Sequence, residues 1–405
     1  MNLKSKLIFL SIYFVSISVF SQNVWSPDES MKIKSISQTD ISNDGKRVAY
    51  VVREAIMERK KSEYISQIWV TNVDTKENTQ YTFNSESSNS PKFSPDGKKI
   101  AFLSSRSGKN QIWIINTLGG EPRKVTEEKK GVSSIQWSPD GKNISFLKSD
   151  DDTEEETKSK EDKTDVILVD KNFKYSHIYS YSFLEDTVHQ ITKGSFTVNN
   201  YNYSPDGKKI IFSHQEDTNI NTGFINTDIS IIDSNGDNLK NLVIRPGLDS
   251  NPIFSGDGKK FAFISSGGNE EPIGLRDVHI YNLKDNKIVK LSNTPNRDSR
   301  IVSWTTDNKM LIISENIKTT SQLLLLPVNG DNYISWSLIN YNEGVITSVV
   351  KSKLSENIAF CYEKLDSPVE VYISNTKEPS FEKLSDINNF EYPKLPKTEI
   401  ISWKS

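Results

Sequence analysis

The sequence contains a single cysteine in 405 residues, which excludes a disulfide framework, and it has no C-x-x-C pair for a structural zinc site. An excess of one charge is also missing: 50 Lys+Arg against 53 Asp+Glu give a net charge of −3, so a nucleic-acid-binding surface is not expected. No stretch of about 12 residues shows a helical period. Aromatic residues reach 10%, too many for a disordered chain. The sequence therefore predicts a folded, strand-rich protein without disulfide, metal or cofactor.

Residues 1–21 have the composition of a secretory signal peptide. Lys4 and Lys6 give a cationic start, Leu7 to Phe20 is apolar, and the small Ser21 precedes the expected cut. The apolar run of about 14 residues is shorter than the roughly 20 that span a bilayer, so cleavage is favoured over a membrane anchor. No other apolar stretch is long enough to span. We therefore expect an exported protein, periplasmic or secreted, with no membrane span in the mature chain.

One motif recurs along the rest of the chain. Its clearest copy is Phe93–Phe102, an aromatic residue and Ser-Pro-Asp-Gly followed by alternating apolar residues. A seventh, degenerate copy lies near Ser352–Ser355. The spacing of about 45 to 65 residues is typical of propeller repeats. The motif aspartates are Asp44, Asp96, Asp140, Asp206, Asp257 and Asp307.

The motif predicts a bulged hairpin turn. Proline presets φ at the second turn position, aspartate bonds to the local backbone, and glycine adopts the left-handed conformation. Asn308, which replaces glycine in the sixth copy, tolerates positive φ better than most residues. Each copy adds a third strand, such as Gln111–Ile114, and a short fourth one, such as Arg123–Thr126. Four antiparallel strands per repeat describe a propeller blade, so the fold class is all-β: a seven-bladed β-propeller of four-stranded antiparallel blades.

The predicted organisation has three parts: a signal peptide at 1–21, a propeller at 22–386 and a connector at 387–405. The blades are expected at approximately 31–84, 85–128, 129–195, 196–244, 245–293, 294–340 and 341–386.

A charged insertion at 150–165 interrupts the third repeat. Asp150–Glu156 runs into alternating lysines and acids, and mixed charge without apolar residues is typical of a solvated loop. The alternative is an acidic lip that selects a cationic peptide terminus or binds a divalent ion. Asp233–Asp237 resembles the start of a calcium loop but lacks its closing glutamate, so we expect a hairpin turn there.

The sequence offers no catalytic, cofactor-binding or metal-binding residue. A G-x-S-x-G elbow, a Gly-rich phosphate loop and H-E-x-x-H are all missing. Gly131–Ile135 lacks the second glycine and leads into a strand. Cys361 is expected to be a buried, inert thiol. The four histidines are expected to be packing or surface residues: His177, His189, His214 and His279.

The S-P-D-G repeats resemble those of TolB-type periplasmic propellers and of the N-terminal propellers of the prolyl oligopeptidase family of serine peptidases. Trp25–Tyr50 is similar to the mature start of bacterial members, particularly the acylaminoacyl-peptidase-like and dipeptidyl-peptidase-like branches. Val166–Asp170 looks like part of their third blade, and Pro396–Ser405 resembles their connector to an α/β-hydrolase domain. TolB-type proteins carry an α/β domain ahead of the blades, whereas here the first blade is expected to begin almost at the cleavage site.

The resemblance implies that substrate selection and catalysis belong to different domains. The family carries its catalytic Ser, Asp and His on the hydrolase domain, so no catalytic residue is carried over and this chain is expected to be inactive alone. Glu154–Glu156 resembles the recognition glutamate pair of dipeptidyl peptidases only loosely, so the role of that pair is not assigned to these residues. The propeller is implied to be a filter that admits peptides and excludes folded proteins. The resemblance also implies an unlatched ring, in which Met31–Ile36, although it alternates like a strand, does not pair near Lys383–Ser385.

Three functions remain open at this point. The first is the substrate-selecting propeller of an exported peptidase, present as a fragment or truncated product, with an exposed apolar face for a hydrolase domain. The second is a self-standing, TolB-like propeller that binds proteins or peptides in the cell envelope. The third is an enzyme for small molecules or sugars, which should show carboxylates with perturbed pKa at the tunnel mouth.

Overall fold

The computed structural model describes residues 25–58, 61–164, 173–271, 273–335, 344–391, 393 and 399–403. Its strands form five four-stranded sheets and one eight-stranded sheet. The predicted signal peptide and the Val166–Asp170 segment lie outside the described residues.

The strands follow one another in chain order. The first sheet contains β1 (Ser35–Ile41), β2 (Arg47–Glu58), β3 (Lys61–Asn72) and β4 (Asn78–Gln80). The next contains β5 (Ser88–Phe93), β6 (Lys99–Ser104), β7 (Gln111–Asn116) and β8 (Arg123–Lys124). The third contains β9 (Ser133–Trp137), β10 (Asn143–Ser149), β11 (Ser176–Ser182) and β12 (Thr187–Gln190).

The eight-stranded sheet consists of two groups of four. One group is β13 (Thr197–Tyr203), β14 (Lys209–Gln215), β15 (Asn226–Asp233) and β16 (Lys240–Val243). The other is β17 (Gly247–Phe254), β18 (Lys260–Ser265), β19 (Asp277–Asn282) and β20 (Lys287–Lys290). Two parallel residue pairs join β15 to β17: Asn226 with Gly247 and Thr227 with Leu248.

Two further four-stranded sheets complete the chain. They contain β21 (Arg300–Trp304), β22 (Met310–Ile317), β23 (Thr320–Pro327) and β24 (Ile334–Ser335), then β25 (Val345–Lys351), β26 (Asn357–Lys364), β27 (Ser367–Asn375) and β28 (Glu382–Lys383). Three short helices are present: α1 (Pro27–Lys32), α2 (Glu154–Glu161) and α3 (Thr222–Ile225).

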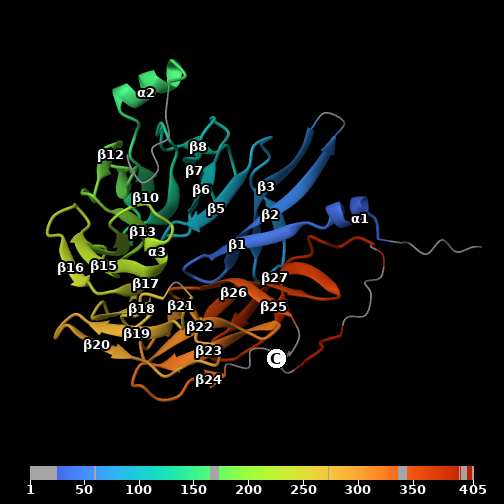
Figure 1. Cartoon of the computed structure of the whole chain (residues 1–405). Coiled ribbons are helices and arrows are strands. Elements are labelled where there is room, and N and C mark those ends of the chain that lie inside the picture. The colour runs from blue at the N-terminus through green and yellow to red at the C-terminus, as the bar shows by residue number, and fades with distance from the viewer. Residues whose placement is uncertain are drawn as a thin grey trace, which may run out of the picture.

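The sheets lie around a common centre. Figure 1 shows the chain passing from blue through green and yellow to red, so that red β26 and β27 return to the side of blue β1. Within each group of four, consecutive strands pair antiparallel. The predicted all-β, propeller-like fold of four-stranded antiparallel sheets is therefore confirmed.

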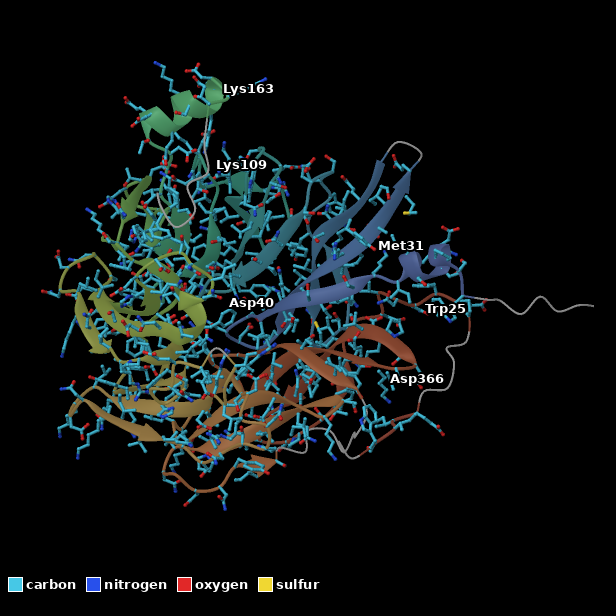
Figure 2. The ribbon with its side chains drawn as sticks, in the orientation of Figure 1. Trp25, Met31, Asp40, Lys109, Lys163 and Asp366 are labelled. Atoms are coloured by element: carbon cyan, nitrogen blue, oxygen red, sulfur yellow. The ribbon has the colours of Figure 1, made fainter. Side chains whose placement is uncertain are left out.

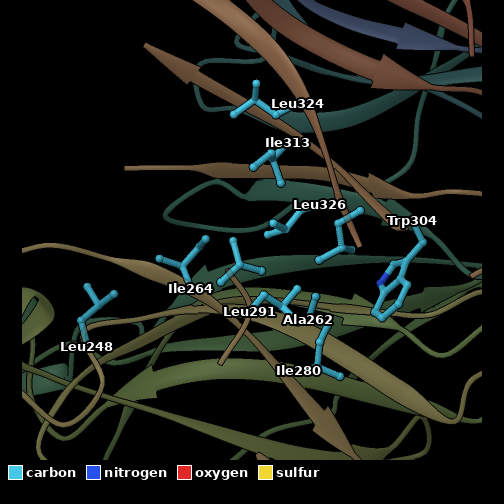
Figure 3. Close-up of a cluster of buried hydrophobic side chains, with 11 residues drawn as sticks. Leu248, Ala262, Ile264, Ile280, Leu291, Trp304, Ile313, Leu324 and Leu326 are labelled. Atoms are coloured by element: carbon cyan, nitrogen blue, oxygen red, sulfur yellow. The ribbon is translucent and has the colours of Figure 1, made fainter. Parts of the chain in front are cut away.

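The hydrophobic core is divided among the spaces between neighbouring groups. Figure 3 shows one such cluster, in which side chains of β18 and β19 face side chains of β22 and β23: Ala262, Ile264 and Ile280 against Ile313, Leu324 and Leu326. Another joins the two ends of the chain, because Val48 and Tyr50 of β2 pack against Val371 and Ile373 of β27. The first and last sheets are thus held together by face-to-face packing.

The S-P-D-G segments form the turns that the sequence predicts. In all six copies the hydroxyl of the first residue donates to the aspartate carboxylate at 2.5–2.7 Å. The same carboxylate accepts the backbone N–H two residues later at 3.0–3.1 Å. The last position adopts φ between 58° and 75° in Gly45, Gly97, Gly141, Gly207, Gly258 and Asn308.

Successive turns also pack on one another. A Cβ atom placed on Gly207 would lie 3.3 Å from Cδ of Pro139, and one on Gly258 would lie 3.6 Å from Cδ of Pro205. In the next pair the proline is replaced by Gly256 and the glycine by Asn308. There the Gly256 N–H donates to Asn308 Oδ1 at 2.6 Å. A proline at this position could not form this hydrogen bond, because it has no backbone N–H. The two departures from the motif therefore compensate each other.

This compensation predicts a coupled pair of substitutions. Gly256→Pro removes the donor and Asn308→Gly removes the acceptor, so each alone is expected to lower the free energy of unfolding by about 1 kcal/mol. The double variant rebuilds the proline–glycine contact of the other turns and is expected to lose less than the sum. Urea unfolding of the four proteins measures the coupling. Strictly additive losses would show that the two residues act independently.

Two local predictions were wrong. Met31 and Lys32 belong to α1, which starts at Pro27 because the Ser26 hydroxyl accepts the Glu29 N–H at the helix N-terminus. The strand expected at Met31–Ile36 begins only at Ser35. The charged insertion, expected as a loop, contains helix α2 with a capping box between Thr153 and Glu156.

The predicted unlatched arrangement agrees with the strand pairing. Among the described residues β1 pairs with β2 and β28 pairs with β27, and no pairing joins Ser35–Ile36 to Lys383–Ser385. The Asn388 side chain, which follows β28, instead binds the backbone that precedes β1. Asn388 accepts the Lys34 N–H at 2.9 Å and donates to the Lys34 carbonyl at 3.0 Å.

Candidate functional site

One face of the molecule carries both ends of the sheet region. Because neighbouring strands are antiparallel, the first strand of each group starts at the edge where the second and third are connected and where the fourth ends. We call this edge the termini face and the opposite edge, which carries the S-P-D-G turns, the turn face. The extended β2–β3 hairpin and helix α2 project from the termini face (Figure 1). Both therefore lie at the edge where the sheet region begins and ends.

Exposed apolar side chains gather on the termini face. Among them Ile273 is 94% exposed and Ile220 is 77% exposed. Fewer such side chains lie on the turn face, namely Leu118, Leu184, Leu239 and Leu354. Those of the termini face come from connections all around the molecule: Met57, Tyr64, Phe83, Ile220, Phe224, Ile244, Ile273, Leu275 and Leu365.

The charged insertion is ordered by ion pairs. Asp152 contacts Lys130 and Lys160, both at 2.8 Å, and these ammonium groups lower the pKa of Asp152 to about 2. Glu156 contacts Lys174. Two of the carboxylates expected to form an acidic lip are therefore neutralised by lysines. Within the described part of the chain, no group of three side chains is placed to hold a metal ion.

A buried ionic group lies near the termini face between β15 and β17. Arg245 binds Asp249 through two hydrogen bonds of 2.8 Å, and Asp249 is fully buried. Burial raises the pKa of the neighbouring Asp228 to about 6, and the charges of Asp249 and Glu216 add to the effect. Because Arg245 already neutralises Asp249, this pair has a structural role.

The centre of the molecule is lined by the first strands of successive groups. Gln38 Oε1 accepts the Ser90 N–H at 2.7 Å, and Asn200 Nδ2 donates to Asn251 Oδ1 at 2.7 Å. Each of these strands carries a register shift, and the residue there often has positive φ: Gln38, Ser90, Ser134, Asn251 and Ser348. The sequence motifs did not predict these bulges in the first strands.

A cavity of about 470 Å³ lies at the turn-face end of these first strands, lined by residues of β1, β5, β9, β13 and β25. Figure 2 places Asp40, one of its lining residues, near the centre of the molecule. The cavity also contains Lys92 and Lys353, so it combines charge with a concave shape.

The histidines and the cysteine lie where the sequence places them. His177, His214 and His279 belong to the repeat strands, and burial lowers the pKa of each, that of His214 to about 4. His214 Nε2 lies 2.8 Å from Ser230 Oγ, but Ser230 is fully buried and out of reach of a substrate. Cys361 is buried, as expected, and burial raises the pKa of its thiol to about 12.

His177 occupies a repeated structural position. At the start of several third strands a polar side chain binds a Thr or Ser 15 residues later, as Gln111 Oε1 does with Thr126 at 2.8 Å. The same hydroxyl accepts the next backbone N–H of the third strand. His177 forms this contact with Thr192 at 3.3 Å. The histidine therefore belongs to the blade framework.

Comparisons with known proteins agree with this architecture. Residues 63–166 match the family model of the Tricorn protease N-terminal beta propeller domain. A stretch of 141 residues is 26% identical to Dipeptidyl-peptidase 5 of Trichophyton equinum and covers 32% of this chain. The structure is similar to Pyrococcus horikoshii acylaminoacyl peptidase, with a TM-score of 0.68 and 19% identity over 89% of this chain.

A second solved structure is similar over nearly its whole length. The β-propeller domain of the Trilobed protease from Pyrococcus furiosus, described as having an open velcro topology, gives a TM-score of 0.63 at 16% identity and covers 90% of this chain and 99% of that one. In contrast, this chain spans 54% of the acylaminoacyl peptidase and 19% of Dipeptidyl-peptidase 5. The predicted resemblance to the propeller domains of peptidases is thereby confirmed at the level of the fold.

Proposed function

We propose that this chain is the substrate-selecting propeller of an exported serine peptidase of the prolyl oligopeptidase family. In this proposal an α/β-hydrolase domain follows the connector at 387–405, docks on the termini face and supplies the catalytic residues. The observation that carries the proposal is the concentration of exposed apolar side chains on that face, such as Ile220 and Ile273. Burying them under a second domain removes their contact with water.

We also propose that the ring has seven blades, with the eight-stranded sheet counted as two and with the boundaries given by the repeats. Support comes from the hydrophobic clusters, one of which lies between each pair of neighbouring groups and the last of which joins the final group to the first. The role assigned to the tunnel is to admit peptides and to hold back folded proteins.

Export is part of the same proposal. The cationic and apolar pattern of residues 1–21 supports a cleavable signal peptide and a periplasmic or secreted product. In the part of the chain that the structure describes, no helix is long and apolar enough to cross a membrane.

Sequencing the genomic DNA beyond codon 405 tests the proposal. We expect an open reading frame that continues into a domain with a G-x-S-x-G elbow followed by Asp and His. A stop codon directly after Ser405, together with stable accumulation of the short product in the cell envelope, would contradict it. In that case a self-standing propeller that binds envelope proteins or peptides would be the better account.

A further inference from the structure

The cavity at the turn-face end of the tunnel holds one uncompensated positive charge. Lys92 is paired with Asp40 at 3.2 Å. Lys351 is almost fully buried, donates to the carbonyls of Ser352 and Ser355, and lies 3.9 Å from the Glu356 carboxylate. Lys353, in contrast, forms no hydrogen bond or ion pair with any described residue. Its ammonium group is the free cation of the cavity.

Lys353 is partly desolvated at the wall of the cavity. Its side chain is exposed, yet it lines the cavity, and desolvation by the surrounding strands lowers its pKa. The Asp40 charge acts in the opposite direction, and the Lys92 charge lowers the pKa further. A bound anion would favour the protonated amine, because an opposite charge nearby stabilises the charged form. The site is therefore arranged to gain an anion.

The rest of the cavity wall combines apolar side chains, such as those of Phe93 and Trp137, with neutral polar ones. Ser134, Gln136, Asn200 and Asn202 supply hydroxyl and amide groups, which are both donors and acceptors. Gln136 Nε2 already donates to the Tyr201 carbonyl at 2.6 Å, so its oxygen is left to accept. Such a wall matches the alternating N–H and C=O groups of an extended peptide.

We propose that this end of the tunnel binds the C-terminal carboxylate of a peptide, with Lys353 as its counter-ion and Lys92 beside it. A single negative charge suits the site, because Asp40 offsets Lys92 and would repel a doubly charged phosphate. The peptide then lies along the tunnel with its N-terminus toward the termini face. This orientation rests on the proposed function, in which the hydrolase domain docks there and meets the N-terminal residues first.

The tunnel length sets the peptide length. Strand β1 has 7 residues, which span about 23 Å at roughly 3.3 Å per residue. An extended peptide of about eight residues is therefore needed to reach from Lys353 to the termini face. Shorter peptides held at Lys353 are expected to remain inside the tunnel.

Calorimetric titration of the chain with an octapeptide of alanine and serine, whose side chains are uncharged, tests the site. The free acid is expected to bind about tenfold more tightly than the C-terminal amide, a difference of ~1.4 kcal/mol. Lys353→Met is expected to reduce the affinity for the acid to that for the amide. Lys193→Met, which removes an exposed lysine from the termini face, is the matched control and should leave both affinities unchanged.

A second variant guards against loss of folding as the explanation. Asp40→Asn removes the negative charge while an amide oxygen remains to accept the Phe93 N–H, so binding of the acid is expected to tighten at least threefold. Equal affinity of acid and amide for the unaltered chain, or no effect of Lys353→Met, would overturn the proposal. So would displacement of the peptide by millimolar acetate or phosphate, which would indicate a site for small anions only. No hydrolase domain is needed, so these outcomes are independent of the peptidase proposal.

Discussion

Replacing Asn388 by alanine is expected to lower the free energy of unfolding by about 2 kcal/mol. The Asn388 side chain is buried and forms three hydrogen bonds, two to the Lys34 backbone and one to the Val369 carbonyl at 3.0 Å. Each is worth about 1 kcal/mol, and water can satisfy part of the Lys34 backbone once the amide is gone. The loss should appear as a lower urea midpoint with an unchanged slope.

The neighbouring residue provides the control. Asn389 is exposed and its amide donates to Asp386 on the same segment, so Asn389→Ala is expected to change stability by less than about 0.5 kcal/mol. If both alanine variants have the same urea midpoint as the unaltered chain, the hydrogen bonds of the Asn388 side chain have no role in closing the ring.

The largest loss of stability is expected for Glu315→Ala, at about 3 kcal/mol. This carboxylate is buried and accepts four hydrogen bonds from the segment that leads into β21. Two come from the backbone N–H groups of Asn296 and Asp298, at 3.0 and 3.1 Å. Removing the carboxylate leaves buried donors without an acceptor, which is costlier than the hydrogen bonds themselves.

Two further variants are compared with Glu315→Ala for their loss of stability. Glu315→Gln keeps one acceptor oxygen and should lie between the unaltered chain and the alanine variant. Glu363→Ala removes an exposed carboxylate from β26 and should cost less than about 0.5 kcal/mol. Thermal unfolding of the unaltered chain and the three variants at one pH makes the comparison. A Glu315→Ala protein as stable as Glu363→Ala would show that the segment is held by its packing alone.

The repeated elements were predictable because their signals are local. The S-P-D-G segment specifies its own turn through the hydroxyl–carboxylate contact, as in Ser94 and Asp96, and through positive φ at Gly97. The polar residue paired with a Thr 15 residues later, as in Gln111 and Thr126, also leaves a regular trace, although the sequence analysis did not use it.

Other features depend on context that the sequence does not display. The alternation of Met31–Ile36 suggested a strand, whereas Ser26 and Pro27 start a helix there. The capping box of Thr153 and Glu156 was a local sign of α2 that the high charge of the insertion obscured. Asn388 lies 354 residues from Lys34, and no periodicity connects them.

The surroundings of Lys353 in the cavity could not be predicted from the sequence either. Lys353 occupies a degenerate copy of the motif and looks like an ordinary surface lysine in the sequence. Its proximity to Asp40 and Lys92 arises only because the first strands of the first and last sheets come together at the centre. The exposed apolar residues of the termini face are likewise scattered along the chain, and only the pairing of the strands places them at the same edge of the sheets.

The measurement that tests the central claim most directly is the substrate selectivity of the longer gene product that the proposal predicts, assayed with an octapeptide and with a stably folded protein. Its Ser→Ala variant at the G-x-S-x-G elbow sets the background. We expect the octapeptide to be cleaved and the folded protein to be spared, while the 405-residue chain alone cleaves neither. A folded protein cleaved as readily as the octapeptide would contradict the role of the propeller as a filter, and no cleavage of the octapeptide above background would contradict the peptidase itself.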